Sequence, residues 1–241
     1  MINFQFEKLN VIDSTNDYLT REIEAGRIIK DKIAVTKYQT NGHGSKDRSF
    51  ISAKDVGIYF TLIHLYKDKD ELEFITQKTA VAVYKAFKEI FDIELSIKWV
   101  NDLYYNDKKV CGILCRNLIK YNAVIIGVGI DLFENKNLDD TIKEIAGYIF
   151  KDKYELVEIL NTKSKLPKDN CTRKNVYDDF KSIKIEGIEI RDEALWEPDH
   201  IVIEIVMRLY ELMMKKGLPK LYIEKNIIKD DKIYEDCDLE C

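Results

Sequence analysis

Apolar residues recur at the three- and four-residue spacing of an amphipathic helix in two long stretches of the chain. These stretches are residues 74–91 and residues 200–216, and both are predicted to be helices. A shorter helix is expected to begin within residues 13–16, where a hydroxyl side chain can cap the first turn. One or two further helices are predicted within residues 136–160.

Short apolar runs between these helices predict β-strands. The run at residues 121–132 is almost entirely apolar, which is typical of a central strand covered on both faces. The predicted strands are residues 32–38, 57–65, 94–99, 109–117 and 121–132. This order of elements predicts an α+β fold, with a mixed, mostly antiparallel β-sheet and helices packed mainly on one face.

The segment at residues 95–116 predicts a β-hairpin with a binding function. Its first apolar run ends in polar residues, and Lys109 then opens a second apolar run that contains Gly112. A glycine lets a ligand approach the backbone closely, and a lysine can hold a carboxylate or a phosphate. A solvated lysine beside a turn is the alternative interpretation of Lys109.

Composition excludes several classes of protein. The chain has 241 residues and a net charge of −5, which argues against a general nucleic-acid binder. It contains no apolar stretch of about 18 residues, and its N-terminus does not resemble a signal peptide. Its five cysteines are scattered, and its three histidines show no metal or triad spacing. We therefore expect a cytoplasmic protein without a metal-ligand cluster, a DNA partner or a membrane anchor.

Four segments, in this order, resemble the catalytic domain of the biotin protein ligases. Ser14-Thr15-Asn16 is similar to the family's S-T-N, and residues 38–48 stand in place of its loop Q-x-x-G-R-G-R-x-G-R. Residues 98–102 and 109–114 resemble K-W-P-N-D and K-x-x-G-I-L, and residues 127–131 resemble G-x-G-I-N. The resemblance spans roughly residues 8–133 and implies the class II synthetase-like fold of biotin and lipoate ligases.

The resemblance implies a reaction and its participants. Family members join biotin to ATP, forming biotinyl-5'-AMP, and pass biotin to a lysine of a biotin carboxyl carrier domain. We therefore expect biotin, ATP and Mg²⁺ as ligands, and a carrier domain of a biotin-dependent carboxylase as partner. Mg²⁺ would be held through waters and ATP phosphates more than by a protein cage. Whether the chain forms a homodimer is left open.

The resemblance also implies roles for particular residues. Lys109 and Arg48 are expected to be catalytic, because a lysine between two reacting anions lowers their repulsion. The residues expected to bind biotin are Ser14, Thr15, Asn16, Gln39, Gly42, Gly57, Gly112 and Leu114. Those expected to bind ATP or the adenylate are Gly44, Lys46, Trp99, Asn101 and Asp131. Each has a structural alternative: residues 14–16 could act only as a helix cap, and Trp99 only as core packing.

The chain departs from the family pattern in its loop, its C-terminal part and one strand end. The loop is poor in arginine, and only Arg48 keeps the usual charge, while Asp131 replaces the usual asparagine. We expect a single catalytic domain at residues 1–223, with an atypical insertion near 161–194 and an acidic tail at 224–241. An N-terminal winged helix and a C-terminal SH3-like domain are not expected.

Three functions compete on this basis. The leading hypothesis is a biotin–protein ligase. The second is a lipoate-type ligase of the same fold, although the combined motifs fit the biotin branch better. The third is a catalytically weak homologue that binds only biotin or a carrier protein, which the arginine-poor loop favours.

Overall fold

One mixed β-sheet organises the part of the chain that the structure describes. The computed structural model describes residues 3–45, 48–162, 184–186 and 199–227. Almost all of the predicted insertion near 161–194 lies outside the described residues, as do Lys46 and most of the predicted tail. None of the helices within the described ranges combines the length and the apolar character needed to cross a membrane.

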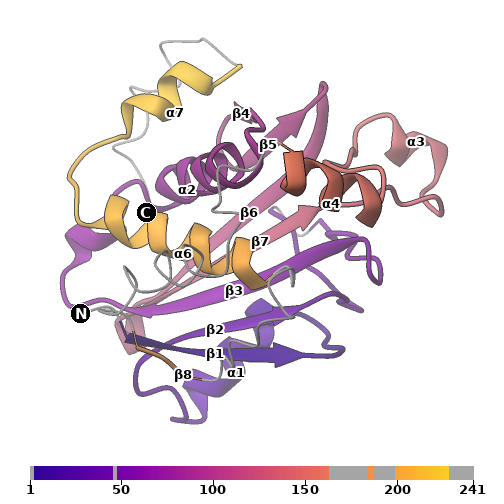
Figure 1. Cartoon of the computed structure of the whole chain (residues 1–241). Coiled ribbons are helices and arrows are strands. Elements are labelled where there is room, and N and C mark those ends of the chain that lie inside the picture. Colours follow the sequence, from indigo (N-terminus) through magenta and orange to yellow (C-terminus); the bar gives the residue numbers. More distant parts are fainter. Residues whose placement is uncertain (1–2, 46–47, 163–183, 187–198, 228–241) are drawn as a thin grey trace.

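The sheet has eight strands in the order β4-β5-β6-β7-β3-β2-β1-β8 (Figure 1). β1 pairs in parallel with β2 and with β8, and every other neighbouring pair is antiparallel. The mixed, mostly antiparallel sheet predicted from the sequence is therefore confirmed. The strands are β1 Asn3–Leu9, β2 Asp31–Thr36, β3 Gly57–Leu65, β4 Ser96–Lys98, β5 Asp102–Tyr105, β6 Lys108–Leu118, β7 Ala123–Asp131 and β8 Lys184–Glu186.

The helices lie mainly on one face of this sheet, as predicted. α2 and α6 pack together on that face (Figure 1), and they share a hydrophobic core with the β3 residues Ile58, Phe60 and Leu62. These three residues share one face because successive side chains of a strand point to opposite faces. The α-helices are α1 Thr15–Glu24, α2 Ile75–Phe91, α3 Asp140–Lys143, α4 Lys153–Thr162, α6 Asp199–Met213 and α7 Lys220–Lys225; short 3-10 turns span Lys69–Leu72 and Ile119–Tyr121.

The opposite face carries a smaller core beneath α1. Leu19 and Ile23 of α1 pack there against a patch of strand residues that includes Ile63 and Ile125. α1 contacts β2, β3 and β7, so it covers only the middle of this face. The neighbouring part, over β6 and the end of β7, is covered instead by the long loop between β2 and β3, and the candidate site lies there.

The predicted hairpin is confirmed, but the prediction of its first strand at residues 94–99 is wrong. The strand predicted at residues 94–99 becomes β4, and the chain then turns at residues 99–101 before β5. β5 is the strand that pairs with β6, through a turn in which Asn106 and Asp107 have φ values of 50° and 60°. Asn and Asp tolerate this left-handed conformation, so the polar turn was read correctly while the strand before it was not.

Candidate active site

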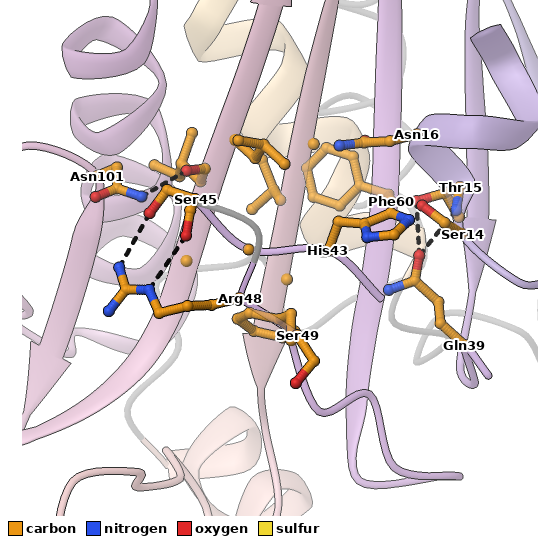
Figure 2. A pocket seen from close by; sticks show the side chains of 18 of the residues that line it. Ser14, Thr15, Asn16, Gln39, His43, Ser45, Arg48, Ser49, Phe60 and Asn101 are labelled. Carbon is orange, nitrogen blue, oxygen red and sulfur yellow. Dashed lines mark hydrogen bonds between the residues drawn. The ribbon is translucent and has the colours of Figure 1, made fainter. Parts of the chain in front are cut away.

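A cavity of about 230 Å³ opens between α1, the β2–β3 loop and the glycine-containing face of β6 and β7. Figure 2 shows Ser14, the N-cap of α1, with Thr15 and Asn16 at one end of this cavity, and Asn101 and Arg48 at the other. Side chains from segments far apart in the sequence therefore meet around one space. We call this space the first cavity.

Hydrogen bonds between buried and half-buried polar groups hold the α1 end of the first cavity. The backbone N–H and the hydroxyl of Thr15 donate to Gln39 Oε1 at 2.8 and 3.1 Å. Gln39 Nε2 donates in turn to Ser52 Oγ at 2.8 Å. The hydroxyl oxygen of Thr61, which is fully buried, lies 2.8 Å from Thr15 Oγ1 and 2.5 Å from Asn16 Oδ1. This network fixes the donors and acceptors that a ligand would meet.

Ser14 combines the two roles that the sequence left as alternatives. It is the N-cap of α1, with extended backbone angles, and its Oγ accepts from Asp17 N at 3.4 Å. It also lines the first cavity. Because the cap bond uses an oxygen lone pair, the hydroxyl hydrogen remains for a ligand.

Glycines on β6 and β7 make the floor of the first cavity. A Cβ on Gly127 would lie 2.3 Å from Asn16 Oδ1, so only glycine leaves room for the Asn16 side chain. A Cβ on Gly112 or Gly129 would lie 2.8 or 2.6 Å from the ring of Phe50. The three glycines thus let α1 and the loop approach the sheet closely.

The loop over the cavity folds back on itself as a small hairpin. Phe50 N donates to Gly42 O at 2.8 Å, Gly44 N donates to Arg48 O at 2.6 Å, and His43 forms an antiparallel bridge with Ser49. The hairpin brings Phe50 over the sheet glycines and His43 toward α1.

Two side chains of this hairpin are held by other residues. His43 Nε2 lies 2.7 Å from Asp17 Oδ2 of α1, which fastens the loop to the helix. The Arg48 guanidinium donates to Ser45 O and to Ser45 Oγ, both at 3.1 Å, as the dashed lines in Figure 2 mark. Arg48 therefore borders the first cavity with part of its hydrogen-bonding capacity already used.

Lys109, at the start of β6, lies where the first cavity meets a second one. It lines both cavities, and its ammonium forms an ion pair with Asp102 Oδ1 at 2.7 Å. A Cβ on Gly112 would lie 3.3 Å from Lys109 Nζ, so the ammonium is close to the floor of the first cavity. Lys109 thus places a cation at the junction of two ligand-sized spaces.

The second cavity has a volume of about 250 Å³ and a mainly apolar wall. Val56, Phe133 and Leu138 contribute to this wall, and Asp131 supplies a carboxyl group. Burial raises the pKa of Asp131 to about 7, although the Lys109 charge and a hydrogen bond from Tyr59 act in the opposite direction. Burial, followed by the Asp131 charge, also raises the pKa of Tyr59 far above its usual value.

A known protein family matches the part of the chain that supplies most of these cavity residues. The model of the biotin/lipoate A/B protein ligase family matches residues 9–131, which is about half of the chain. The chain belongs to this family.

Relatives within the family show how much of the chain is shared. The bifunctional ligase/repressor BirA of Bacillus subtilis is 32% identical over 143 residues, which are 57% of this chain and 43% of that protein. Biotin–protein ligase 1, chloroplastic, of Arabidopsis thaliana is 28% identical over 127 residues, which are 50% of this chain and 34% of that protein. The chain thus spans less than half the length of these two relatives.

Solved structures share the fold. The biotin protein ligase of Aquifex aeolicus in complex with biotin and ATP superposes with a TM-score of 0.59 at 23% identity, covering 91% of this chain and 74% of that one. The enzyme from Leishmania major in complex with biotinyl-5-AMP gives a TM-score of 0.60 at 19% identity, covering 99% and 83%. The biotin/lipoate ligase fold predicted from the motifs is confirmed.

Most of the residues predicted for the ligase site come together around the two cavities. Asp131 and Lys109 line the second cavity. Those that line the first are Ser14, Thr15, Asn16, Gln39, Gly44, Arg48, Asn101, Lys109, Gly112 and Leu114. Lys46 lies outside the described residues.

Three predicted residues line neither cavity. Gly42 and Gly57 serve backbone packing, since a Cβ on Gly42 would lie 2.5 Å from Phe50 O and one on Gly57 would lie 2.3 Å from Ile130 O. Trp99 packs against the core, with its ring 6.0 Å from that of Tyr222 between centroids. For Trp99, the structure therefore favours the core alternative over a direct contact with a ligand.

Sequence reasoning did not select Phe50 or Thr61. Thr61 stands in the apolar strand β3, and its contact with Thr15 joins residues that are 46 positions apart. No local sequence pattern therefore predicts this contact. Phe50 stands two residues after the Arg48 that closed the recognised loop motif, and an aromatic residue there could have been included.

Within the described ranges, no group of three or more His, Cys, Asp or Glu side chains could hold a metal ion.

Proposed function

We propose that the chain is an ATP-dependent biotin–protein ligase. It converts biotin and ATP to biotinyl-5'-AMP across the two cavities and transfers biotin to a lysine of a biotin carboxyl carrier domain. The observation that carries this proposal is the position of Lys109, which borders both cavities and so stands where a carboxylate and an α-phosphate would meet.

The polar end of the first cavity supports biotin as the acid. A ureido group carries two N–H donors and one carbonyl acceptor, and Ser14, Thr15 and Asn16 offer hydroxyl and amide groups of both kinds. The dithiolane ring of lipoate has no comparable groups. Burying that ring here would leave the Ser14 hydroxyl hydrogen, which the protein network does not use, without an acceptor, and an unsatisfied group of this kind costs about 1–3 kcal/mol.

The second cavity supports a nucleotide. Its apolar wall, which includes Phe133 and Leu138, suits the faces of a planar base, and Asp131 and Asn135 provide polar groups at its edge. A nucleotide there would direct its α-phosphate toward Lys109, because Lys109 is the basic residue among the described residues that line that cavity.

The proposed chemistry follows from the charges at this junction. The biotin carboxylate attacks the α-phosphorus of ATP, and pyrophosphate leaves. The Lys109 ammonium lies between the two anions and stabilises the charge that the transition state spreads over them, while Asp102 holds the ammonium in place. The amine of the carrier lysine then attacks the acyl carbon, and AMP leaves.

A second candidate is a homologue that binds biotin but turns over slowly. The observation that favours it is the hydrogen bonding of Arg48, whose guanidinium donates twice to Ser45. An arginine engaged within its own loop contributes less to holding phosphates.

The test measures pyrophosphate release by the purified chain with ATP and Mg²⁺, in the presence of biotin or of lipoate. Release that requires biotin supports the ligase, and release that requires lipoate would move the chain to the lipoate branch. Calorimetric binding of biotin without release would identify the slow-turnover homologue.

A pair of variants tests whether biotin binds in the first cavity. Gly112→Val should abolish biotin binding, because its Cβ would lie 2.8 Å from the Phe50 ring and 3.3 Å from Lys109 Nζ. Ala25→Val, at the exposed C-cap of α1, adds side-chain volume outside the cavity and should bind biotin normally. Equal affinity in both variants would exclude the first cavity as the biotin site.

A further inference from the structure

Two carboxyl groups compete for one lysine at the junction of the cavities. Lys109 pairs with Asp102 at 2.7 Å, and its charge also acts on Asp131, which lines the second cavity. Among the described residues that line this cavity, Asp131 is the acidic one and Lys109 the basic one. With both carboxyls ionised, the three groups carry a net charge of −1 in the place where a ligand phosphate would lie.

The surroundings of Asp131 supply little else that could offset this charge. The Tyr59 hydroxyl of β3 and the Cys111 thiol of β6 are the neutral ionisable groups that the Asp131 charge reaches, and the Tyr59 hydroxyl donates to Ala53 O at 3.3 Å. Residues 133–147, which close the cavity, add no ionisable side chain to the described lining. Burial raises the pKa of Asp131 to about 7, so proton exchange there is accessible near neutral pH.

An anion brought next to Lys109 changes this balance. A phosphate would add a negative charge close to Asp131 and would take up part of the field of Lys109, and both effects favour the neutral carboxyl. A neutral Asp131 can also donate a hydrogen bond, which an ionised one cannot.

We propose that Asp131 determines the charge selectivity of the second cavity: a phosphate-bearing ligand binds there with uptake of a proton at Asp131, whereas an uncharged ligand does not. This inference rests on the proposed function, because it assumes that the second cavity holds the nucleotide part of the adenylate.

A direction of pH dependence follows. Below the pH at which free Asp131 ionises, the carboxyl is already neutral and the affinity for the phosphate ligand is at its maximum. As the pH rises through that range, binding has to draw a proton from solution, and the affinity falls by up to tenfold per pH unit until the bound form also ionises. With asparagine at the same position, the affinity should stay level.

The experiment uses the whole chain and the phosphodiester of biotinol with adenosine 5'-monophosphate. This probe spans both cavities, and its single negative charge does not titrate between about pH 5 and 9, since a phosphodiester has no second ionisation near neutral pH. Calorimetry at pH 7.5, in two buffers with different ionisation enthalpies, counts the protons taken up. Adenosine serves as the uncharged ligand.

We expect uptake of about half a proton or more with the phosphodiester, none with adenosine, and none in Asp131→Asn. That variant should bind the probe about tenfold more tightly than wild type at pH 8.5, and with similar affinity at pH 5.5. Asp92→Asn, which removes a carboxyl at the end of α2, is the control and should take up protons like wild type.

Probe binding by wild type without proton uptake would overturn this inference and leave the proposed function intact. Proton uptake that persists in Asp131→Asn would also overturn it, because the proton would then bind elsewhere. Absence of probe binding in every variant would overturn the proposed function itself, and this inference with it.

Discussion

Replacing Gly127 by alanine should break the polar network at the α1 end of the first cavity. The new Cβ would lie 2.3 Å from Asn16 Oδ1, 2.7 Å from Nδ2 and 2.9 Å from Cγ. Ordinary contacts of carbon need about 3.5 Å, so the Asn16 amide has to retreat by about 1 Å. Its 2.5 Å contact with the Thr61 hydroxyl, which is fully buried, would then be lost.

The cost combines overpacking with a lost hydrogen bond. Overpacking a tight site costs about 1–3 kcal/mol, and a lost hydrogen bond about 1 kcal/mol. Thr61 keeps its 2.8 Å contact with Thr15, so the full penalty for an isolated polar group does not apply. We expect Gly127→Ala to lower the free energy of unfolding by about 2–4 kcal/mol, and Tm by about 5–12 °C for a chain of this size.

Gly129→Ala is the matched control. It adds the same methyl group two residues along the same strand, but there the Cβ meets the ring of Phe50, 2.6 Å away. Phe50 is half-buried and belongs to the loop, so it can move more easily than Asn16, and we expect a cost below about 1 kcal/mol. Denaturant titration of both variants measures the difference.

A double-mutant cycle tests the reasoning directly. In Asn16→Ala the amide is absent, so adding Gly127→Ala should cost less than about 1 kcal/mol. If Gly127→Ala costs as much in that background as in wild type, Asn16 does not lie over Gly127 and the proposed cause is wrong.

Three other predictions address the lysine, a buried histidine and the loop. Lys109→Ala should reduce biotin-dependent pyrophosphate release by about 100-fold or more while the chain stays folded; release near the wild-type rate would mean that Lys109 only pairs with Asp102. His64 is buried, which opposes its charge, but hydrogen bonds and charges from Asp31 and Glu71 outweigh this and raise its pKa. Its contribution to stability should be complete below about pH 6.5 and should decline as the pH rises through the raised pKa, by at most about 1.4 kcal/mol per pH unit. Urea titration gives the free energy of unfolding of wild type and of His64→Gln, and an equal difference between the two proteins at pH 6 and at pH 9 would contradict this. Ser45→Arg removes the Oγ that Arg48 now binds and adds a cation to the loop. Biotinyl-5'-AMP should then dissociate more slowly, because a charge-assisted hydrogen bond contributes about 1.5–3 kcal/mol. Equal dissociation rates from wild type and Ser45→Arg would show that Ser45 does not weaken the loop.

Local sequence patterns were sufficient to predict the helices and strands whose residues are buried along most of their length. β3 and β7 are buried on both faces, so their apolar runs could be recognised without knowing their partners. α2 and α6 were recognised by the helical spacing of their apolar residues, although most of their side chains are buried because the two helices also pack against each other. The motif residues of α1, β6 and the loop indicated the family, and most of them do line the cavities.

Elements that depend on distant partners were missed. β1 lies at the start of the chain and pairs in parallel with β2, and it was not predicted although Phe4 and Phe6 alternate in the manner of a strand. β5 is short and partly polar, and its identity as a strand comes from pairing on both edges with β4 and β6. Hydrogen bonds between strands are made across the sheet, so the local sequence constrains them weakly.

The sequence by itself determined the family, the polar character of residues 14–16 and the presence of a lysine and a glycine in one hairpin. Only the tertiary structure decided that Thr61 supports Thr15, that Asn16 requires a glycine at position 127, and that Asp131 and Asp102 act on the same lysine. The physical reason is distance along the chain. Propensity and periodicity act within a few residues, whereas a cavity is formed by side chains from strands that the sheet topology brings together.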